Sequence, residues 1–230
     1  MTDTETEKKL RVLSNMELLP DMHLYYLSYL KDTGLNPKVI YDIGACVLHW
    51  TKKAKNEVWS GSQFFCFEAM SEPEFLYKEF GVDGYHTGIL TNVDNRFVDY
   101  YKSVEFPGGN SYYRENPDLA GSHNLYTEDT KFKMRGLTLD TVVTFYNFPL
   151  PNFIKMDVQG AELDIIKGAT KCMAHADDVI LELQNVDYNM GAPKANEVVD
   201  YMTSIGYKMI EPAPFCSNGL DGDYHFKRVK

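Results

Sequence analysis

The stretch Ile154-Lys-Met-Asp-Val-Gln-Gly-Ala-Glu-Leu-Asp-Ile-Ile-Lys-Gly-Ala169 is the most informative part of this chain. An apolar run that begins at Phe153 ends on the carboxylate of Asp157, and Gly160 then allows a sharp turn into a segment with helical spacing. This pattern predicts a β-strand, a tight turn and a helix packed against the strand. In open α/β sheets, ligands bind beyond the carboxyl ends of the strands. We therefore expect a functional site centred on Asp157.

A second strand end of the same design lies upstream, in Lys38-Val-Ile-Tyr-Asp-Ile-Gly-Ala-Cys46. β-Branched residues lead to Asp42, and Gly44 then opens a segment that we expect to be helical, whose free N–H groups would face the same crevice. Glu68 ends the next predicted strand, 24 residues after Gly44. An acidic residue at about this distance commonly binds the ribose hydroxyls of a nucleotide-like cofactor. The two segments together predict a cofactor site.

The residues after Gly44 bear on which cofactor binds. The dinucleotide fingerprint needs three glycines, whereas Gly44 is followed here by residues such as Cys46 and Leu48, with no further glycine before Gly61. A pyrophosphate would therefore lack its glycine-lined cradle, which disfavours NAD and FAD. S-Adenosylmethionine carries no phosphate and needs the tight turn, a ribose carboxylate and partners for its amino acid group. The pattern favours this cofactor, with an NAD-type oxidoreductase and a non-catalytic binding protein as alternatives.

Composition sets the broad class of the protein. A length of 230 residues with 44% hydrophobic residues suits a single globular domain, residues 1–230. A net charge of -10 disfavours a nucleic-acid partner. The N-terminus is polar and acidic, no apolar stretch is long enough to span a membrane, and the four cysteines are scattered. We expect a cytoplasmic protein with reduced thiols.

The order of predicted elements indicates three parts: an N-terminal helical cap at 1–36, a Rossmann-like core at 37–230, and an insertion or lid at 91–136. Alternating strands and helices predict a mainly parallel α/β sheet, closed by an antiparallel pair. The expected strands are 38–42, 63–67, 85–90, 153–157, 178–183, 207–210 and 224–229, and the expected helices include 47–57, 139–146 and 161–175. Ser71-Glu-Pro-Glu74 matches a capping box.

Residues 154–169, together with Leu137-Thr-Leu-Asp140, Tyr41-Asp-Ile-Gly-Ala45 and Phe67-Glu68, resemble the FkbM-type methyltransferases. These are S-adenosylmethionine-dependent enzymes of the class I Rossmann-like fold, and the match covers about residues 38–210. The resemblance implies a seven-stranded sheet with a reversed last strand and helices on both faces. It also implies methyl transfer to oxygen, often on a sugar or other secondary metabolite.

The resemblance implies cofactor contacts at Asp42, Gly44 and Glu68, with the neighbouring Ala45 and Ala69 and with Asp157. This chain departs from the usual pattern in two places. Cys46 and Leu48 stand where the family usually has Asn and a second Gly, and Ala69 stands where Pro is common.

Methyl transfer to a hydroxyl requires alignment of the acceptor and removal of its proton. The candidates for the base are Asp157 and a histidine, either His123 in the insertion or His86 beside the third predicted strand. Glu162, Glu182 and Gln184 are candidate acceptor-binding residues, although Glu162 equally suits a helix-stabilising charge in the first turn. A divalent metal at Asp157 and Glu182 is an alternative that we do not favour, so no metal ligands are assigned.

The insertion is rich in tyrosine, which offers stacking faces and hydroxyl donors to a sugar or aromatic acceptor. These tyrosines are Tyr100, Tyr101, Tyr112, Tyr113 and Tyr126. The expected partner is thus a small-molecule or glycan acceptor.

Overall fold

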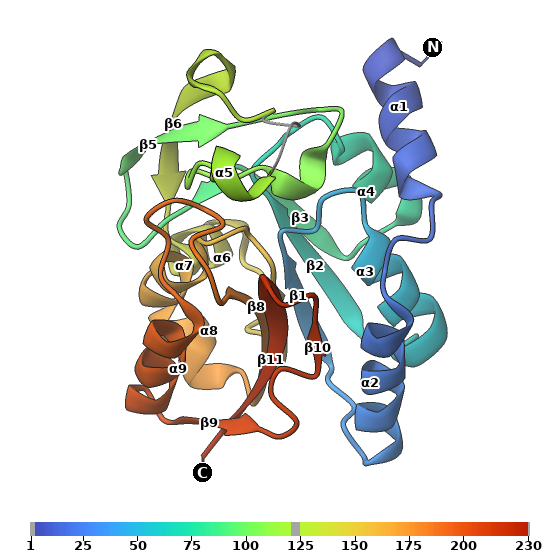
Figure 1. Cartoon of the computed structure of the whole chain (residues 1–230). Helices are drawn as coiled ribbons and strands as arrows, with labels where there is room; N and C mark the ends of the chain where they lie inside the picture. The colour runs from blue at the N-terminus through green and yellow to red at the C-terminus, as the bar shows by residue number, and fades with distance from the viewer. Residues whose placement is uncertain (1–2, 121–124, 230) are drawn as a thin grey trace.

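A mostly parallel sheet forms the centre of the computed structural model, which describes residues 3–120 and 125–229 (Figure 1). The strand order is β3-β2-β1-β7-β8-β11, and both β9 and β10 pair with the outer edge of β11. Among the described strands of this sheet, β11 alone runs against the others. The bounds are β1 Val39–Ile43, β2 Gln63–Glu68, β3 Gly84–Thr87, β7 Phe153–Met156, β8 Asp178–Gln184, β9 Tyr207–Ile210, β10 Cys216–Ser217 and β11 Asp221–Arg228.

The expected α/β fold and antiparallel closing pair are confirmed, but the sheet has eight strands where seven were predicted. The expected strand 207–210 is β9, and the additional strand is the two-residue β10, which pairs with β11 further along the same edge. Pro212 and Pro214 fall between them, and a proline has no N–H group to donate to a neighbouring strand. The ladder is therefore interrupted there.

Helices cover both faces of the sheet (Figure 1). One face carries α1 Glu5–Ser14, α2 Asp21–Asp32, α3 His49–Lys53 and α4 Glu74–Phe80, and the other carries α6 Leu139–Tyr146, α7 Glu162–Lys167, α8 Thr170–His175 and α9 Ala195–Ser204. Successive side chains of a strand point to opposite faces. In β1, Tyr41 and Ile43 accordingly pack in the core beneath α6 to α9, while Ile40 packs with α2 and α3.

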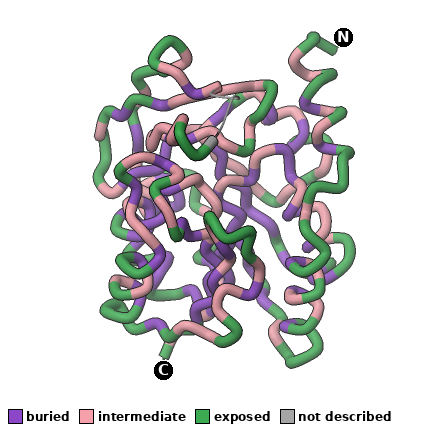
Figure 2. The backbone as a smooth tube through the Cα atoms, in the orientation of Figure 1, coloured by how far each residue is buried: buried purple, intermediate pink, exposed green. Residues whose placement is uncertain are grey.

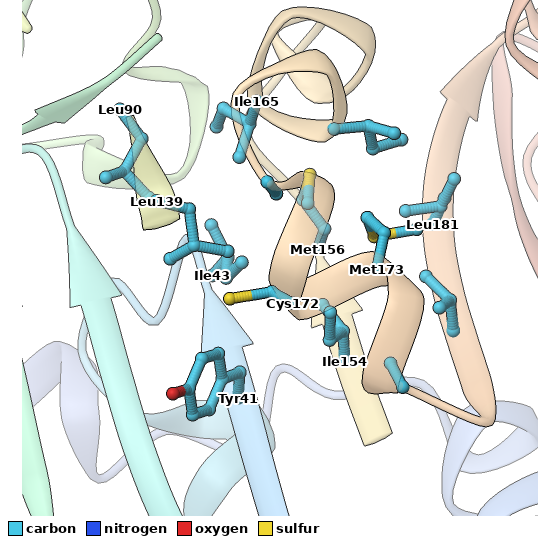
Figure 3. Close-up of a cluster of buried hydrophobic side chains, with 14 of the residues drawn as sticks. Tyr41, Ile43, Leu90, Leu139, Ile154, Met156, Ile165, Cys172, Met173 and Leu181 are labelled. Carbon is cyan, nitrogen blue, oxygen red and sulfur yellow. The ribbon is translucent and has the colours of Figure 1, made fainter. Parts of the chain in front are cut away.

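The larger core is formed where β1, β7 and β8 meet α6, α7 and α8 (Figure 3). Ile154 and Met156 of β7 are fully buried in it, against Cys172 and Met173 of α8. The burial of the central strands is visible along the whole middle of the molecule (Figure 2). This rigid centre holds the carboxyl ends of β1, β2 and β7 in fixed positions.

The helix predicted over 139–146 is confirmed as α6. Two other predicted helices are each divided into two shorter segments. The segment expected as 161–175 forms α7 and α8, with Gly168 between them, because a side chain at Gly168 would overlap the Thr91 carbonyl oxygen. The segment expected as 47–57 starts as α3 and continues as a π-helix, Ala54–Val58. The predicted capping box at Ser71 is wrong: α4 begins after Pro73, without a side-chain cap.

The insertion carries a second, three-stranded sheet of order β4-β6-β5, formed by β4 Ile89–Leu90, β5 Phe97–Tyr101 and β6 Lys131–Leu137. The strand expected at 85–90 is therefore split between the two sheets. A short helix, α5 Pro117–Ala120, follows β5 above the carboxyl ends of the central strands (Figure 1). In the part of the chain that the structure describes, no helix has the length and apolar character needed to cross a bilayer.

Candidate active site

The two strand ends singled out from the sequence lie side by side. Gly44 adopts a φ of 81°, and its N–H donates to the Phe67 carbonyl at 2.9 Å. On its other side, the backbone of Asp157 passes so close that a Cβ atom at Gly44 would overlap the Asp157 carbonyl oxygen. Glycine is needed here both for the left-handed backbone and for the close approach. The turns after β1 and β7 thus pack directly against each other.

A pocket of about 630 Å³ opens at this point, above the ends of β1, β2 and β7. Four of the sequence-predicted residues line it, namely Gly44, Glu68, Ala69 and Asp157. The opposite wall comes from β4 and from the insertion that follows it. It includes Ile89, Leu90, Tyr100, Asn110 and Tyr112.

Glu68 occupies the floor of this pocket. Its carboxylate accepts hydrogen bonds from the backbone N–H groups of Cys46, at 2.8 Å, and Met70, at 2.9 Å. Burial raises the pKa of Glu68 to about 7, and the backbone N–H groups only partly oppose that effect. Cys46 therefore contributes its main chain to this turn, which explains how the turn tolerates a residue other than the usual Asn.

Tyr100, from β5, stands on the pocket wall with its hydroxyl buried. This hydroxyl forms no hydrogen bond of good geometry with any described residue, although the Asn110 amide lies near it. A buried polar group without a partner is costly. The pocket therefore offers a ligand both an acceptor, Glu68, and an unpaired hydroxyl.

Asp42 and Ala45 do not face the pocket. Asp42 is fully buried, where it accepts a hydrogen bond from the Thr51 hydroxyl at 2.6 Å and lies 3.5 Å from the Lys155 ammonium group. Ala45 packs in the small core beneath α1 and α4. Neither side chain lines the pocket: Asp42 points, like Ile40, to the face of the sheet that α2 and α3 cover, and Ala45 packs below α1 and α4, so both support the turn from beneath.

Asp157 lies at the centre of a polar network on the pocket wall. Its carboxylate accepts from the Gln159 amide at 3.0 Å and from the Lys155 ammonium group at 3.3 Å. Burial would raise the pKa of Asp157, but the charge of Lys155 and these hydrogen bonds lower it below its usual value. Glu182 is also bound by the Gln159 amide, at 2.7 Å.

The pKa of Glu182 is raised well above its usual value by burial and by the charge of Asp157, with Asp221 and Asp223 adding to the effect. The two pKa values are thus moved in opposite directions, which favours an ionised Asp157 beside a Glu182 that binds a proton more readily. Gln159 fixes their positions from a left-handed backbone, with a φ of 54°.

Glu162 and Gln184 lie behind the pocket wall. Glu162 is 3% exposed and accepts from the Val158 backbone N–H at 2.9 Å, so it holds the turn after β7. Burial raises its pKa to about 8. Gln184 is bound to Asn189, beneath Gly160. Both were predicted to contact the acceptor. In the structure, the Glu162 carboxylate and the Gln184 carboxamide are buried and hydrogen-bond within the protein. His123 lies outside the described residues.

Sequence reasoning missed Gln159 and Asn110 as residues of the pocket wall. Gln159 directly precedes Gly160, and its place in the same turn as Asp157 was an available signal. Asn110 lies in a segment with no periodic pattern, so the sequence contained no such signal. Among the described residues, no group of three or more His, Cys, Asp or Glu side chains is arranged to hold a metal ion.

The fold and the pocket define a class of protein. A parallel sheet with one reversed strand, a glycine turn after β1 and an acidic residue at the end of β2 are the features of a Rossmann-like, class I methyltransferase. The model of the methyltransferase FkbM domain matches residues 25–209. The chain therefore belongs to the FkbM methyltransferase family, which confirms the resemblance predicted from the sequence.

Known proteins show the same relationship. The hexuronic acid methyltransferase AglP of Haloferax volcanii is 32% identical over 76 residues, which are 33% of this chain and 31% of that protein. The crystal structure of methyltransferase FkbM from Methylobacillus flagellatus aligns with a TM-score of 0.50 and 14% identity, over 95% of this chain and 58% of that one.

An O-methyltransferase from Bacillus cereus, solved with S-adenosylhomocysteine, also aligns with a TM-score of 0.50. Its identity to this chain is 10%, and the alignment covers 100% of this chain and 93% of that one. At this level of identity, the two structures show that the fold is shared.

Proposed function

We propose that this protein is an S-adenosylmethionine-dependent O-methyltransferase that acts on a hydroxyl group of a sugar, a glycan or a small metabolite. One observation carries the proposal: Gly44, Glu68 and Asp157, which come from three separate strand ends, line a single pocket. Membership of the FkbM family supports methyl transfer as the reaction, and the partial match to a hexuronic acid methyltransferase supports a sugar acceptor.

The pocket suits the cofactor without phosphate groups. Glu68 would bind the ribose hydroxyls, because its carboxylate oxygens keep lone pairs beyond those used by Cys46 and Met70. Ala69, Ile89 and Leu90 would cover the adenine with apolar surface. The unpaired Tyr100 hydroxyl adds a polar contact within the same pocket. Asp42 and Lys155 would support the turn from below.

S-Adenosylmethionine supplies an activated methyl group, so the protein has to align the acceptor and take up its proton. Asp157 suits this task because Lys155 keeps its carboxylate ionised and the Gln159 amide fixes its direction. Asp157 would take up the hydroxyl proton as the methyl group passes from the sulfonium sulfur to the acceptor oxygen, and S-adenosylhomocysteine would be the leaving product. Glu182 is held beside Asp157 by the same Gln159 amide.

Calorimetric titration tests the cofactor assignment. We expect S-adenosylmethionine and S-adenosylhomocysteine to bind in a one-to-one ratio, and NAD to give no heat of binding. Release of S-adenosylhomocysteine during incubation with candidate sugars would then show turnover. Binding of NAD without binding of S-adenosylmethionine would contradict the proposal. Binding of S-adenosylmethionine without turnover of any acceptor would favour a non-catalytic role.

A further inference from the structure

A second, larger cavity adjoins the pocket. It spans about 1570 Å³, its solvent-filled mouth included, and shares Cys46, Pro107, Gly108 and Gln159 with the first pocket, so the two spaces meet beside the polar network of Asp157. Its walls come from four parts of the chain that are far apart in sequence. Three of them are the end of α1 with the loop after it, the turn after β1, and the described residues 105–109, 115 and 125–126; the fourth part is the loops that bring in Gln159, Tyr188 and Asn218.

The described residues of this cavity wall are mainly apolar and aromatic, and the charged side chains among them are carboxylates. Phe106, Tyr126 and Tyr188 supply rings, and Glu105, Glu115 and Asp221 supply charge. No lysine or arginine is found among the described residues that line it. Among the described residues of the wall, His49 is the one histidine, and its Nε2 donates a hydrogen bond to the Leu13 carbonyl at 2.7 Å.

The three carboxylates differ in their partners. Glu105 is exposed and lies 3.0 Å from the Lys9 ammonium group, so its charge is balanced at the rim. Glu115 is 8% exposed and accepts a hydrogen bond from the Tyr188 hydroxyl, while the adjacent Arg114 pairs with Glu128. In residues 3–120 and 125–229, neither Glu115 nor Asp221 has an ion-pair partner. Two negative charges on the cavity wall are therefore left without a cation.

These charges lie within electrostatic reach of one another and of the reacting centre. Glu115 and Asp221 both raise the pKa of the Tyr188 hydroxyl, so both carboxylates lie near this one side chain. The charge of Asp157 contributes to a raised pKa of Asp221, after the larger effect of burial. A series of negative groups thus extends from Asp157 along the cavity to Glu115.

We infer that the second cavity binds the methyl acceptor and selects an acceptor that carries an ammonium group close to the methylated hydroxyl. This inference rests on the proposed function for the choice of reaction. A cation would pair with Glu115 and Asp221 and would lie against the aromatic rings, whereas a carboxylate would be repelled by both charges. The acceptor therefore differs in charge from the hexuronic acid of the partial relative.

Three small probes that share one ring and differ in charge test the inference: benzylammonium, benzyl alcohol and benzoate. Each is titrated, with ligand-observed NMR, into the full chain loaded with S-adenosylhomocysteine. We expect benzylammonium to bind about tenfold more tightly than benzoate at low salt. In the double variant Glu115→Gln, Asp221→Asn, the ratio should fall to about threefold or less, because both charges are removed.

Asp200→Asn is the matched control, since Asp200 is an exposed acid on α9 outside both cavities. This variant should prefer benzylammonium over benzoate by the same factor as the wild type. Asp221→Asn alone is the second variant, because Asp221 is less buried than Glu115; it should lose part of the preference. Thermal melting verifies that each variant is folded.

The inference is overturned if benzoate binds as tightly as benzylammonium, if none of the probes binds, or if the double variant keeps the wild-type preference. Failure of the proposed function has a different signature. In that case S-adenosylhomocysteine itself does not bind, while titration of the same probes into the free protein still reports the charge preference of the cavity.

Discussion

Single carboxyl groups in this site are tuned in opposite directions by their neighbours. Lys155 and the Gln159 amide keep Asp157 ionised, while burial shifts Glu68 and Glu182 toward their protonated forms. Carboxyl groups whose pKa values are moved apart in one site can take different chemical roles. Asp157 is suited to accept a proton, and Glu68 is suited to bind hydroxyl groups once it is ionised.

Substitution of Glu68 should weaken cofactor binding. We expect Glu68→Ala to raise the dissociation constant of S-adenosylmethionine about tenfold or more, because hydrogen bonds to a charged group are worth about 1.5–3 kcal/mol. Since the pKa of Glu68 is about 7, wild-type affinity should increase from about pH 6 to about pH 8. Titration calorimetry at both pH values measures this. Glu68→Gln is the matched variant and should lose the pH dependence; equal affinities of Glu68→Ala and wild type would refute the assignment.

Substitution of Asp157 should separate binding from turnover. Asp157→Asn keeps the shape of the side chain and its bond with Gln159, but it cannot accept the acceptor's proton. We expect kcat to fall about 10²–10⁴-fold with cofactor affinity changed by less than about threefold. Single-turnover release of S-adenosylhomocysteine gives the rate, and Asp200→Asn serves as the control. Retention of wild-type kcat would rule out Asp157 as the base.

At the scale of elements, the site depends on the contact between the turns after β1 and β7. Gly44 approaches the Asp157 backbone at a distance that leaves no space for a side chain, and this contact sets the width of the pocket. The hydrogen bond from the Val158 backbone N–H to the Glu162 carboxylate also fixes the turn after β7. A local change in either turn should therefore alter both the Glu68 side and the Asp157 side of the pocket.

Gly44→Ala should destabilise the protein and impair cofactor binding together. The new methyl group would overlap the Asp157 carbonyl oxygen, and alanine would have to adopt a φ of 81°. We expect a loss of about 2–4 kcal/mol of unfolding free energy, measured by urea denaturation. Gly61→Ala is the control, because a Cβ atom there would meet nothing within 4 Å. Similar stabilities of both variants would show that the contact is not tight.

Strand ends and short helices were predictable from local patterns, as β1, β2 and α6 show. The direction of one site residue was not. Asp42 is a strand residue, since β1 extends to Ile43. Strand alternation directs its side chain, like that of Ile40, to the face of the sheet that α2 and α3 cover. Likewise, the break between α7 and α8 depends on the approach of Thr91 to Gly168, a long-range contact with no local signal.

At the scale of the whole molecule, the part of the site that the sequence predicted is the first pocket. Its residues Gly44, Glu68 and Asp157 lie in consecutive strand–turn–helix units. The second cavity combines α1, the insertion and the end of the chain, which only the completed fold brings together (Figure 1). Tyr126, one of the tyrosines of the insertion, lines that cavity, while its role toward an acceptor stays a prediction. The charge of the cavity could not be predicted, because it depends on which acids find a basic partner elsewhere.

The accumulation of buried acids has a consequence for stability. Glu68 and Glu162 are buried carboxyl groups whose pKa values are raised to about 7 and about 8. Between the unfolded pKa of 4.5 and these values, the folded protein binds more protons than the unfolded chain. Their contribution to stability is therefore greatest at acidic pH and is lost as the pH rises through the folded pKa. Without ligand, the protein should melt at a lower temperature at about pH 9 than at about pH 6.

Glu162→Gln isolates this effect, because the amide oxygen can still accept from the Val158 N–H but carries no charge to desolvate. One pKa unit corresponds to about 1.4 kcal/mol, so the variant should gain about 2 kcal/mol more, relative to wild type, at about pH 9 than at about pH 6. Thermal and urea unfolding at both pH values measure the difference. An equal change at the two pH values would mean that Glu162 stays ionised in the folded protein, stabilised by the backbone N–H groups of the turn after β7, so that this turn would be an anion-binding element rather than a buried neutral one.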